Sequence, residues 1–324
     1  MESNNKEEEE EGKLVLLLRP LFPSFYSTLS QKFRFLKPWE SPLPLGEFLS
    51  AHARSVRVIL CSGPSPVDAE TIRSLPRLEL VVATGAGVDH VDMDECRRRG
   101  IAVTNAGGVF ADDSADYAVG LVIDVLRKVS ASDRYVRRGL WPASGDYPLG
   151  SKVGGKRVGI VGLGNIGGRV AKRLEAFGCI ISYFSRRRKS SVSYKYFSNV
   201  RDLAAENDVL IASCALTSET HHIIDREVMS ALGKEGIIIN IGRGALIDEK
   251  ELVSCLVKGE IWGAGLDVYE NEPLVPEELF QLENVVLSRH VAVLTPDSIS
   301  DMFQLATGNL EAFFSNRELL SPVN

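Results

Sequence analysis

Short apolar runs separated by helix-like stretches begin at Leu14. Four runs in the first third are rich in Val, Ile and Leu and have the length of strands buried on both faces: residues 14–18, 56–62, 78–84 and 101–106. Between them, Asp68–Leu75 and Val91–Arg99 have a helical pattern. This alternation predicts a parallel sheet covered by helices, whereas residues 19–55 are rich in Pro and aromatics and give no clear pattern.

A long apolar helix, expected from about Asp113 to Val129, leads into a second block of the same kind. Its apolar residues recur at helical spacing: Ala118, Leu121, Val122, Val125 and Leu126. The Gly- and Pro-rich stretch Gly139–Gly155 predicts a connecting loop. Six further runs predict strands, at 158–163, 180–185, 208–215, 236–242, 261–269 and 284–288. Helices are expected at 166–177, 201–207, 226–232 and 250–258, which together make a doubly wound sheet.

Composition narrows the class of protein. The chain has 324 residues, 44% hydrophobic and 25% charged, which is typical of a globular protein of two domains. Residues 1–13 carry six Glu and two Lys, so the formal net charge of -6 leaves only -2 for the rest. We therefore expect residues 1–12 to be a disordered acidic tail. The charge gives no case for a nucleic-acid partner, and no apolar run is long enough to span a membrane.

The five cysteines contain no CxxC pair, and the acidic N-terminus resembles neither a signal peptide nor an Arg-rich transit peptide. Cysteine usage of this kind favours a reducing compartment over a disulfide framework. We therefore expect a cytoplasmic protein without a structural metal, with a plastid as the alternative location.

A glycine motif opens the second block. Gly162, Gly164 and Gly167 form GLGNIG, with Asn165 and Ile166 inside it, after an apolar strand and before an amphipathic helix. The first Gly permits a tight turn, the second lets a pyrophosphate approach the backbone, and the third lets helix and strand pack closely. In this context the motif predicts a dinucleotide-binding site at the helix N-terminus.

The following strand indicates which dinucleotide binds. An NAD site usually has an acidic residue about 20 positions after the first Gly. Here this region contains Ser185, Arg186 and Arg187 and has no acidic residue. A serine hydroxyl and arginine guanidinium groups would bind a 2′-phosphate. A solvated basic turn is the alternative. The pattern predicts a preference for NADPH, with NADH weaker.

Three polar residues end consecutive predicted strands. Arg243, Glu272 and His290 would converge at the carboxyl edge of the sheet, where doubly wound folds bind ligands. Arg would clamp a substrate carboxylate, His would donate a proton to a carbonyl oxygen, and Glu would orient the imidazolium. Singly, each has a plainer interpretation: a loop cap, a surface acid and a packed core imidazole. Together they predict reduction of a 2-oxo acid.

These motifs are similar to those of a known family. GLGNIG at 162–167, NIGRG at 240–244, GLDVYENEP at 265–273 and SRH at 288–290 resemble the D-isomer-specific 2-hydroxyacid dehydrogenases. Within the family, the chain most resembles plant glyoxylate/hydroxypyruvate reductases and hydroxyphenylpyruvate reductases. The resemblance covers about residues 14–320. It implies reduction of hydroxypyruvate, glyoxylate or 4-hydroxyphenylpyruvate to the D-2-hydroxy acid.

The resemblance also assigns residues. Arg243, Glu272 and His290 match the family's catalytic residues, and the loop holding Ala86 and Gly87 matches the one whose amides bind the substrate carboxylate. Further cofactor contacts are implied at Cys214, Thr220, Ile241, Arg243 and Asp267. Trp141 resembles an aromatic that reaches the partner subunit's substrate pocket, although a structural Trp in a loop is the alternative.

The implied architecture has two domains. A smaller flavodoxin-like α/β substrate domain takes residues 13–107 and 291–324, and a Rossmann cofactor domain takes 108–290. A homodimer built partly on the long helix is also implied.

Two features leave alternatives open. The family usually has Pro before its catalytic His, and this chain has Arg289. The family also includes corepressor-type proteins that sense nucleotides and keep the triad, so a binding protein remains the alternative from another class. Phosphoglycerate dehydrogenase is a weaker enzymatic rival, because the chain has no room for a regulatory domain.

Overall fold

The computed structural model describes residues 13–52, 54–61 and 65–323, so the expected acidic tail at 1–12 lies outside the described residues. The chain forms two compact units. One combines the described residues up to Phe110 with those from Thr295 onward, and the other is Ala111–Leu294. The sequence predicts domain boundaries after residues 107 and 290, and the two units divide after residues 110 and 294. The binding role expected of each unit stays a prediction.

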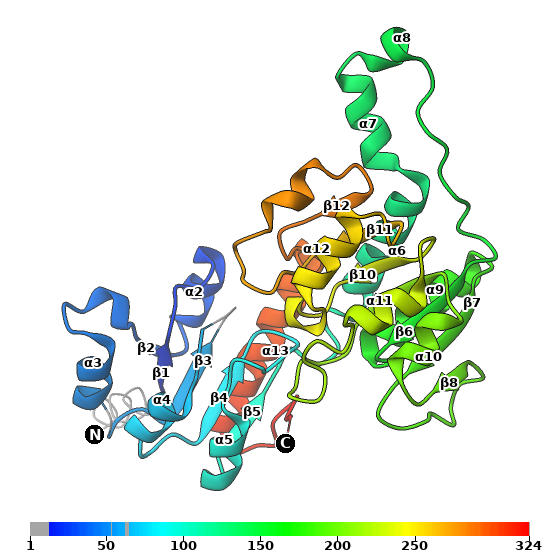
Figure 1. Cartoon of the computed structure of the whole chain (residues 1–324). Helices are drawn as coiled ribbons and strands as arrows, with labels where there is room; N and C mark the ends of the chain where they lie inside the picture. The colour runs from blue at the N-terminus through cyan, green and yellow to red at the C-terminus, as the bar shows by residue number, and fades with distance from the viewer. Residues whose placement is uncertain (1–12, 53, 62–64, 324) are drawn as a thin grey trace, which may run out of the picture. The chain divides into compact units, whose positions relative to one another are not determined.

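The first unit is built on a five-stranded parallel sheet in the order β2-β1-β3-β4-β5, the order of flavodoxin-like folds. Its strands are β1 Leu14–Leu17, β2 Arg34–Leu36, β3 Val58–Cys61, β4 Leu80–Ala83 and β5 Ala102–Thr104. Its helices are α2 Pro23–Leu29, α3 Leu45–His52, α4 Ala69–Ser74, α5 Met93–Arg99 and α13 Pro296–Phe314. The C-terminal helix α13 packs against β4 (Figure 1), and its Ala306 and Leu310 join the core around Val15 and Leu17.

The second unit holds a seven-stranded parallel sheet in the order β12-β11-β10-β9-β6-β7-β8. Its strands are β6 Arg157–Val161, β7 Ile180–Phe184, β8 Lys195–Phe197, β9 Val209–Ala212, β10 Ile237–Asn240, β11 Gly263–Leu266 and β12 Val285–Leu287. Its helices are α6 Ala111–Arg127, α7 Val129–Arg137, α8 Leu140–Ser144, α9 Asn165–Ala176, α10 Val200–Ala205, α11 Arg226–Leu232 and α12 Glu249–Val257. The sheet order reverses between β6 and β9, which is where doubly wound folds bind ligands.

Successive residues of each central strand pack into cores on opposite faces of this sheet. Ile237 and Ile239 face α6 and α9, and Ile238 faces the core shared with α10, α11 and α12. Period-two alternation with apolar residues on both faces is what a parallel sheet requires. The Rossmann and flavodoxin-like architecture expected from the sequence is confirmed.

Three details of the expected second block are wrong. The sheet has seven strands rather than six, because β8 pairs with β7 at the edge. The expected loop at 139–155 contains helix α8, which begins after Gly139 at φ 68°. Helix α7 also continues beyond the expected end of α6, after a break at Lys128 with φ 55°. Among the described residues, no helix is both long and apolar enough to cross a membrane.

Candidate active site

The three fingerprint glycines each occupy a position that the expected motif requires. Gly162 has φ 100°, and a Cβ there would lie 2.6 Å from the backbone of Cys214. At Gly167 a Cβ would lie 2.2 Å from the carbonyl oxygen of Gly162. Gly164, in contrast, has no atom within 4 Å of its Cβ direction. The close approaches at the first and third glycines and the open face at the second fit a bound pyrophosphate.

The N-terminus of α9 is open at the same place. Gly164 and Asn165 are exposed where the helix begins, and Ile166 packs partly against the core. A cavity of about 370 Å³ extends from Gly164 along the side of α9 and is lined in part by Lys172, Glu175 and Lys189. The free N–H groups at the helix N-terminus are suited to binding phosphates.

Hydrogen bonds hold the backbone of the basic turn after β7. Tyr183 is fully buried, and its hydroxyl oxygen accepts a 2.8 Å hydrogen bond from the Lys189 N–H. Ser185 Oγ donates to the Arg187 carbonyl oxygen at 2.6 Å, and the side chains of Arg186 and Arg187 are exposed. The turn thus presents guanidinium groups to solvent from a fixed backbone.

The loop after β9 faces the glycine turn. Cys214 contacts Gly162 through its backbone, and burial raises the pKa of the Cys214 thiol to about 11, so it stays protonated at neutral pH. Thr220 Oγ1 accepts a hydrogen bond from the Thr217 N–H and donates one to the Ala215 carbonyl oxygen, which closes the loop. Ile241, after β10, is 7% exposed and packs in the core. Cofactor contacts by these three residues stay predictions.

Arg243 lies in the turn after β10, half-buried, with Nη1 donating to the Gly242 carbonyl oxygen at 2.9 Å. The next residue, Gly244, packs so closely on the segment after β11 that a Cβ would lie 1.8 Å from the carbonyl carbon of Tyr269. Only Gly fits this contact. The contact therefore joins the turn that carries Arg243 to the segment that leads to Glu272.

Glu272 and His290 are paired. His290 Nδ1 lies 2.9 Å from Glu272 Oε2, and the other carboxylate oxygen accepts from the Tyr269 N–H at 3.1 Å. Burial on its own would raise the pKa of Glu272, but the hydrogen bond and charge of His290, the Tyr269 N–H and Arg243 lower it below its ordinary value. The sequence-predicted triad thus gathers at the carboxyl edge of one sheet, with a carboxylate that remains ionised beside the imidazole.

The backbone of His290 is unusual and is held by Asp267. His290 has φ 57°, a left-handed conformation that is uncommon for a residue with a side chain. Asp267 is 1% exposed, and its carboxylate accepts hydrogen bonds from Ser288 Oγ, the Val291 N–H and the Ala292 N–H at 2.6, 2.8 and 2.9 Å. Both oxygens are directed at the His290 loop. The expected contact of Asp267 with the nicotinamide carboxamide stays a prediction.

The predicted carboxylate-binding loop follows β4 in the other unit. The carbonyl oxygen of Gly85 accepts from the Ala106 N–H at 2.9 Å, and that of Ala86 accepts from Asn105 Nδ2 at 2.6 Å. Ala86 and Gly87 are half-buried. The carbonyl groups are thus used to fix the loop, which is a suitable frame for backbone amides that bind an anion.

Two further predicted residues are exposed. Trp141 lies on α8 with 61% of its surface exposed, and Arg289 precedes His290 with its side chain exposed. One pair was not anticipated from the sequence: His222 Nε2 lies 2.8 Å from Glu270 Oε1. In the sequence, the neighbouring histidines His221 and His222 are the only signal for this pair, because Glu270 is 48 residues away from His222.

Comparison with known proteins shows which family the chain belongs to. The family model described as "D-isomer specific 2-hydroxyacid dehydrogenase, NAD binding domain" matches residues 119–292. The chain is 57% identical to a glyoxylate/hydroxypyruvate reductase from Arabidopsis thaliana, covering 98% of each chain. It is 48% identical to a hydroxyphenylpyruvate reductase from Plectranthus scutellarioides, covering 95% of this chain and 98% of that one.

A solved structure has a similar fold. The NADPH-dependent glyoxylate/hydroxypyruvate reductase from Sinorhizobium meliloti, in complex with NADP and malonate, matches with a TM-score of 0.89. The two sequences are 37% identical, and the match covers 96% of each chain. The fold and site thus define a nicotinamide-dependent oxidoreductase. The chain belongs to the D-isomer-specific 2-hydroxyacid dehydrogenases.

Proposed function

We propose that the protein reduces small 2-oxo acids to D-2-hydroxy acids with NADPH in preference to NADH. The observation that carries the proposal is the His290–Glu272 pair at 2.9 Å, at the carboxyl edge of a sheet with a complete glycine fingerprint. The relatives named for hydroxypyruvate, glyoxylate and hydroxyphenylpyruvate support these three as the candidate substrates.

The proposed chemistry divides among a few groups. A bound NADPH supplies the hydride for the carbonyl carbon. His290 donates a proton to the carbonyl oxygen from Nε2, because Nδ1 faces Glu272. Glu272 orients the imidazole through its contact with Nδ1. Arg243 binds the substrate carboxylate through its planar guanidinium, and the backbone amides of Ala86 and Gly87 in the other unit are a second candidate for binding a carboxylate.

The proposed cofactor preference rests on the turn after β7. Ser185, Arg186 and Arg187 offer a hydroxyl and two guanidinium groups, and no carboxylate is present there to repel a 2′-phosphate. The similar Sinorhizobium meliloti enzyme is described as NADPH-dependent and was solved with NADP.

We also propose that the protein forms a homodimer. Helices α7 and α8 and the following segment expose Val136, Trp141 and Leu149 at 53%, 61% and 92%. A contiguous patch of such side chains would mark an interaction surface. A second copy of the chain would cover them, with Trp141 reaching the partner subunit's substrate pocket.

The test is a spectrophotometric assay of purified protein that crosses NADPH and NADH with hydroxypyruvate, glyoxylate and 4-hydroxyphenylpyruvate. We expect faster oxidation of NADPH than of NADH in the wild type and a fall in turnover of about 10²–10⁴-fold in His290→Gln. Tight NADPH binding without turnover on any of the three would favour the corepressor-type sensor, a class to which none of the relatives reported above belongs.

A further inference from the structure

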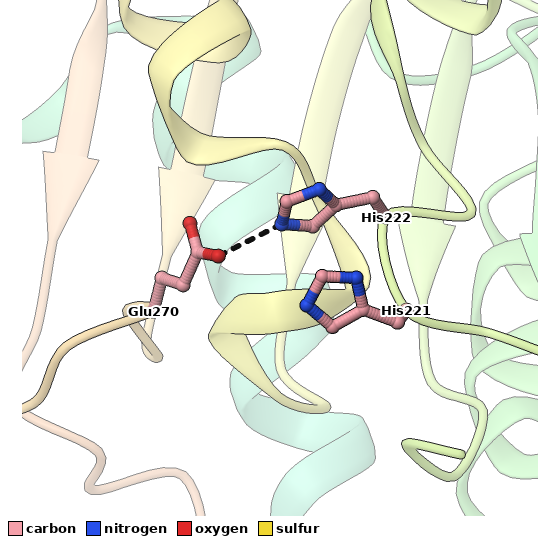
Figure 2. A group of neighbouring side chains, drawn as sticks. All are labelled: His221, His222 and Glu270. Carbon is pink, nitrogen blue, oxygen red and sulfur yellow. Dashed lines mark hydrogen bonds and ion pairs between the residues drawn. The ribbon is translucent and has the colours of Figure 1, made fainter. Parts of the chain in front are cut away.

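A second cluster of histidine and carboxylate side chains lies in the same unit, formed by His221, His222 and Glu270 (Figure 2). His222 Nε2 lies 2.8 Å from Glu270 Oε1, and the rings of His221 and His222 stack with centroids 3.9 Å apart. One ligand atom from each side chain lies within 4.8 Å of the other two. Figure 2 shows both imidazoles turned toward the side on which Glu270 lies.

The backbone places these side chains together. His222 has φ 52°, a left-handed conformation that costs energy for a residue with a side chain, and its N–H donates to the Ala245 carbonyl oxygen at 2.8 Å. Neighbouring side chains of an extended chain point to opposite sides, whereas this conformation brings the two rings face to face. Glu270 is fixed opposite them, because Gly244 packs on its backbone.

We propose that His221, His222 and Glu270 form a binding site for a divalent transition metal ion, for which Zn²⁺ is the best match. Two imidazole nitrogens and one carboxylate oxygen would bind the ion, and water would complete a tetrahedron. Imidazole ligands favour Zn²⁺ over Mg²⁺ or Ca²⁺, which bind through oxygen. Zinc–ligand bonds of about 2.0–2.2 Å set the ligand atoms about 3.3 Å apart, so the exposed His221 ring must turn out of its stack on His222 to direct a nitrogen lone pair, which lies in the ring plane, at the ion.

Two further carboxylates, of Asp248 and Glu249, lie around the three proposed metal ligands. Asp248 Oδ2 lies 3.8 Å from His222 Nδ1, on the ring edge opposite Glu270, and Asp248 is itself fixed as the N-cap of α12. A metal-binding imidazole commonly donates its other N–H to a carboxylate, and shortening of this 3.8 Å separation to hydrogen-bond distance would supply that contact. Glu249 Oε2 accepts from the Glu270 N–H at 3.1 Å.

Negative charge also gathers near the cluster. The carboxylate of Glu249 accepts the hydrogen bond from the Glu270 N–H, and Glu272 follows two residues after Glu270. A cation bound at Glu270 would offset part of this negative charge. The site plays no part in the proposed proton transfer, so it stands or falls independently of the proposed function.

The test is calorimetric titration of the full-length, metal-free protein with Zn²⁺. We expect one Zn²⁺ per chain, with an affinity that falls by more than about tenfold in His221→Gln and in Glu270→Gln and by about tenfold in Asp248→Asn. The matched control is His52→Gln, since His52 packs on Phe48 in the other unit and should leave the affinity unchanged. Titration with Co²⁺ should give visible ligand-field bands in the wild type that His221→Gln loses.

The His290–Glu272 pair is a competing site of similar geometry. Zn²⁺ binding that His290→Gln abolishes and His221→Gln leaves intact would overturn the proposal, as would absence of Zn²⁺ binding in the wild type. Unfolding temperatures measured with EDTA should be equal in the wild type and His221→Gln, so that loss of binding cannot be attributed to misfolding.

Discussion

The main-chain N–H of His290 donates a 2.7 Å hydrogen bond to the carbonyl oxygen of Asp267. Together with the three bonds accepted by the Asp267 carboxylate, it holds a left-handed residue at the end of β12 in place. Strained residues persist when their surroundings fix them from several sides, and they cluster at functional sites. A buried acid therefore determines where the proposed proton donor lies.

Replacing Asp267 should disturb both folding and turnover. Asp267→Ala leaves two buried N–H groups without acceptors, so the free energy of unfolding should fall by on the order of 2–3 kcal/mol, and kcat should fall with it. Denaturant unfolding and steady-state kinetics measure the two effects. Ser288→Ala, which removes one of the three donors, is the control and should cost about 1 kcal/mol. A fully stable and active Asp267→Ala protein would contradict the positioning role.

Removal of the proposed proton donor should lower turnover. His290→Gln keeps a side chain that can hydrogen-bond to Glu272 but supplies no acidic proton, so kcat should fall by about 10²–10⁴-fold. Fluorescence titration should show NADPH affinity within about threefold of the wild type. Retention of full turnover would refute the proposed mechanism.

The pH dependence should report on Glu272. Its lowered pKa means that its carboxylate stabilises the fold at neutral pH and that this contribution is lost as pH falls through the lowered pKa, below the ordinary value of 4.5. The difference in unfolding free energy between wild type and Glu272→Gln should therefore shrink on acidification. Urea unfolding at a series of pH values measures this difference. A difference that stays constant through the acidic range would argue against the pairing.

The fingerprint glycines give a matched comparison. Gly167→Ala places a Cβ 2.2 Å from a carbonyl oxygen and should lower stability, whereas Gly164→Ala has open space and should fold normally. Gly164→Ala should nevertheless raise the KM for NADPH by about tenfold, because its Cβ enters the path of the pyrophosphate. Thermal unfolding and kinetics separate the two effects. Equal stability losses in both variants would show that the open face has no special role.

Cofactor choice can be tested at the basic turn. Arg186→Ala should lower the ratio of kcat/KM for NADPH to that for NADH by at least about tenfold, the worth of a charge-assisted hydrogen bond. Arg188→Ala removes an equally exposed charge two residues away and should change the ratio little. Equal effects of both substitutions would indicate a general attraction rather than a 2′-phosphate site.

Central strands were predictable because they are buried on both faces. Ile237, Ile238 and Ile239 form a continuous apolar run whose length and context indicate a parallel strand. The edge strand β8, Lys195–Phe197, is short and has one buried residue, so its pattern is weak. Helix α8 follows a Gly and contains a Pro. Because both residues are typical of turns, the sequence predicted a loop there.

The site was predictable where residues end consecutive strands, because parallel topology brings those ends together. Arg243, Glu272 and His290 followed from this rule. The direction of a side chain did not follow from it: Asp267 turns into the His290 loop, and Glu270 reaches back to His222. Such contacts depend on loop conformations, here with left-handed backbone at both histidines, that no periodic pattern encodes.

The interleaved order of the two units has a consequence for biosynthesis. Residues 111–294 are contiguous, whereas the unit that begins before them needs α13 from the end of the chain to complete its core. On a ribosome, the contiguous unit can therefore finish folding first, while the earlier unit waits for Ala306 and Leu310. Limited proteolysis of arrested nascent chains that end before Thr295 should find the contiguous unit protected and β1 to β5 still open to cleavage. The order in which the units mature is thus the reverse of the order in which they begin to be made.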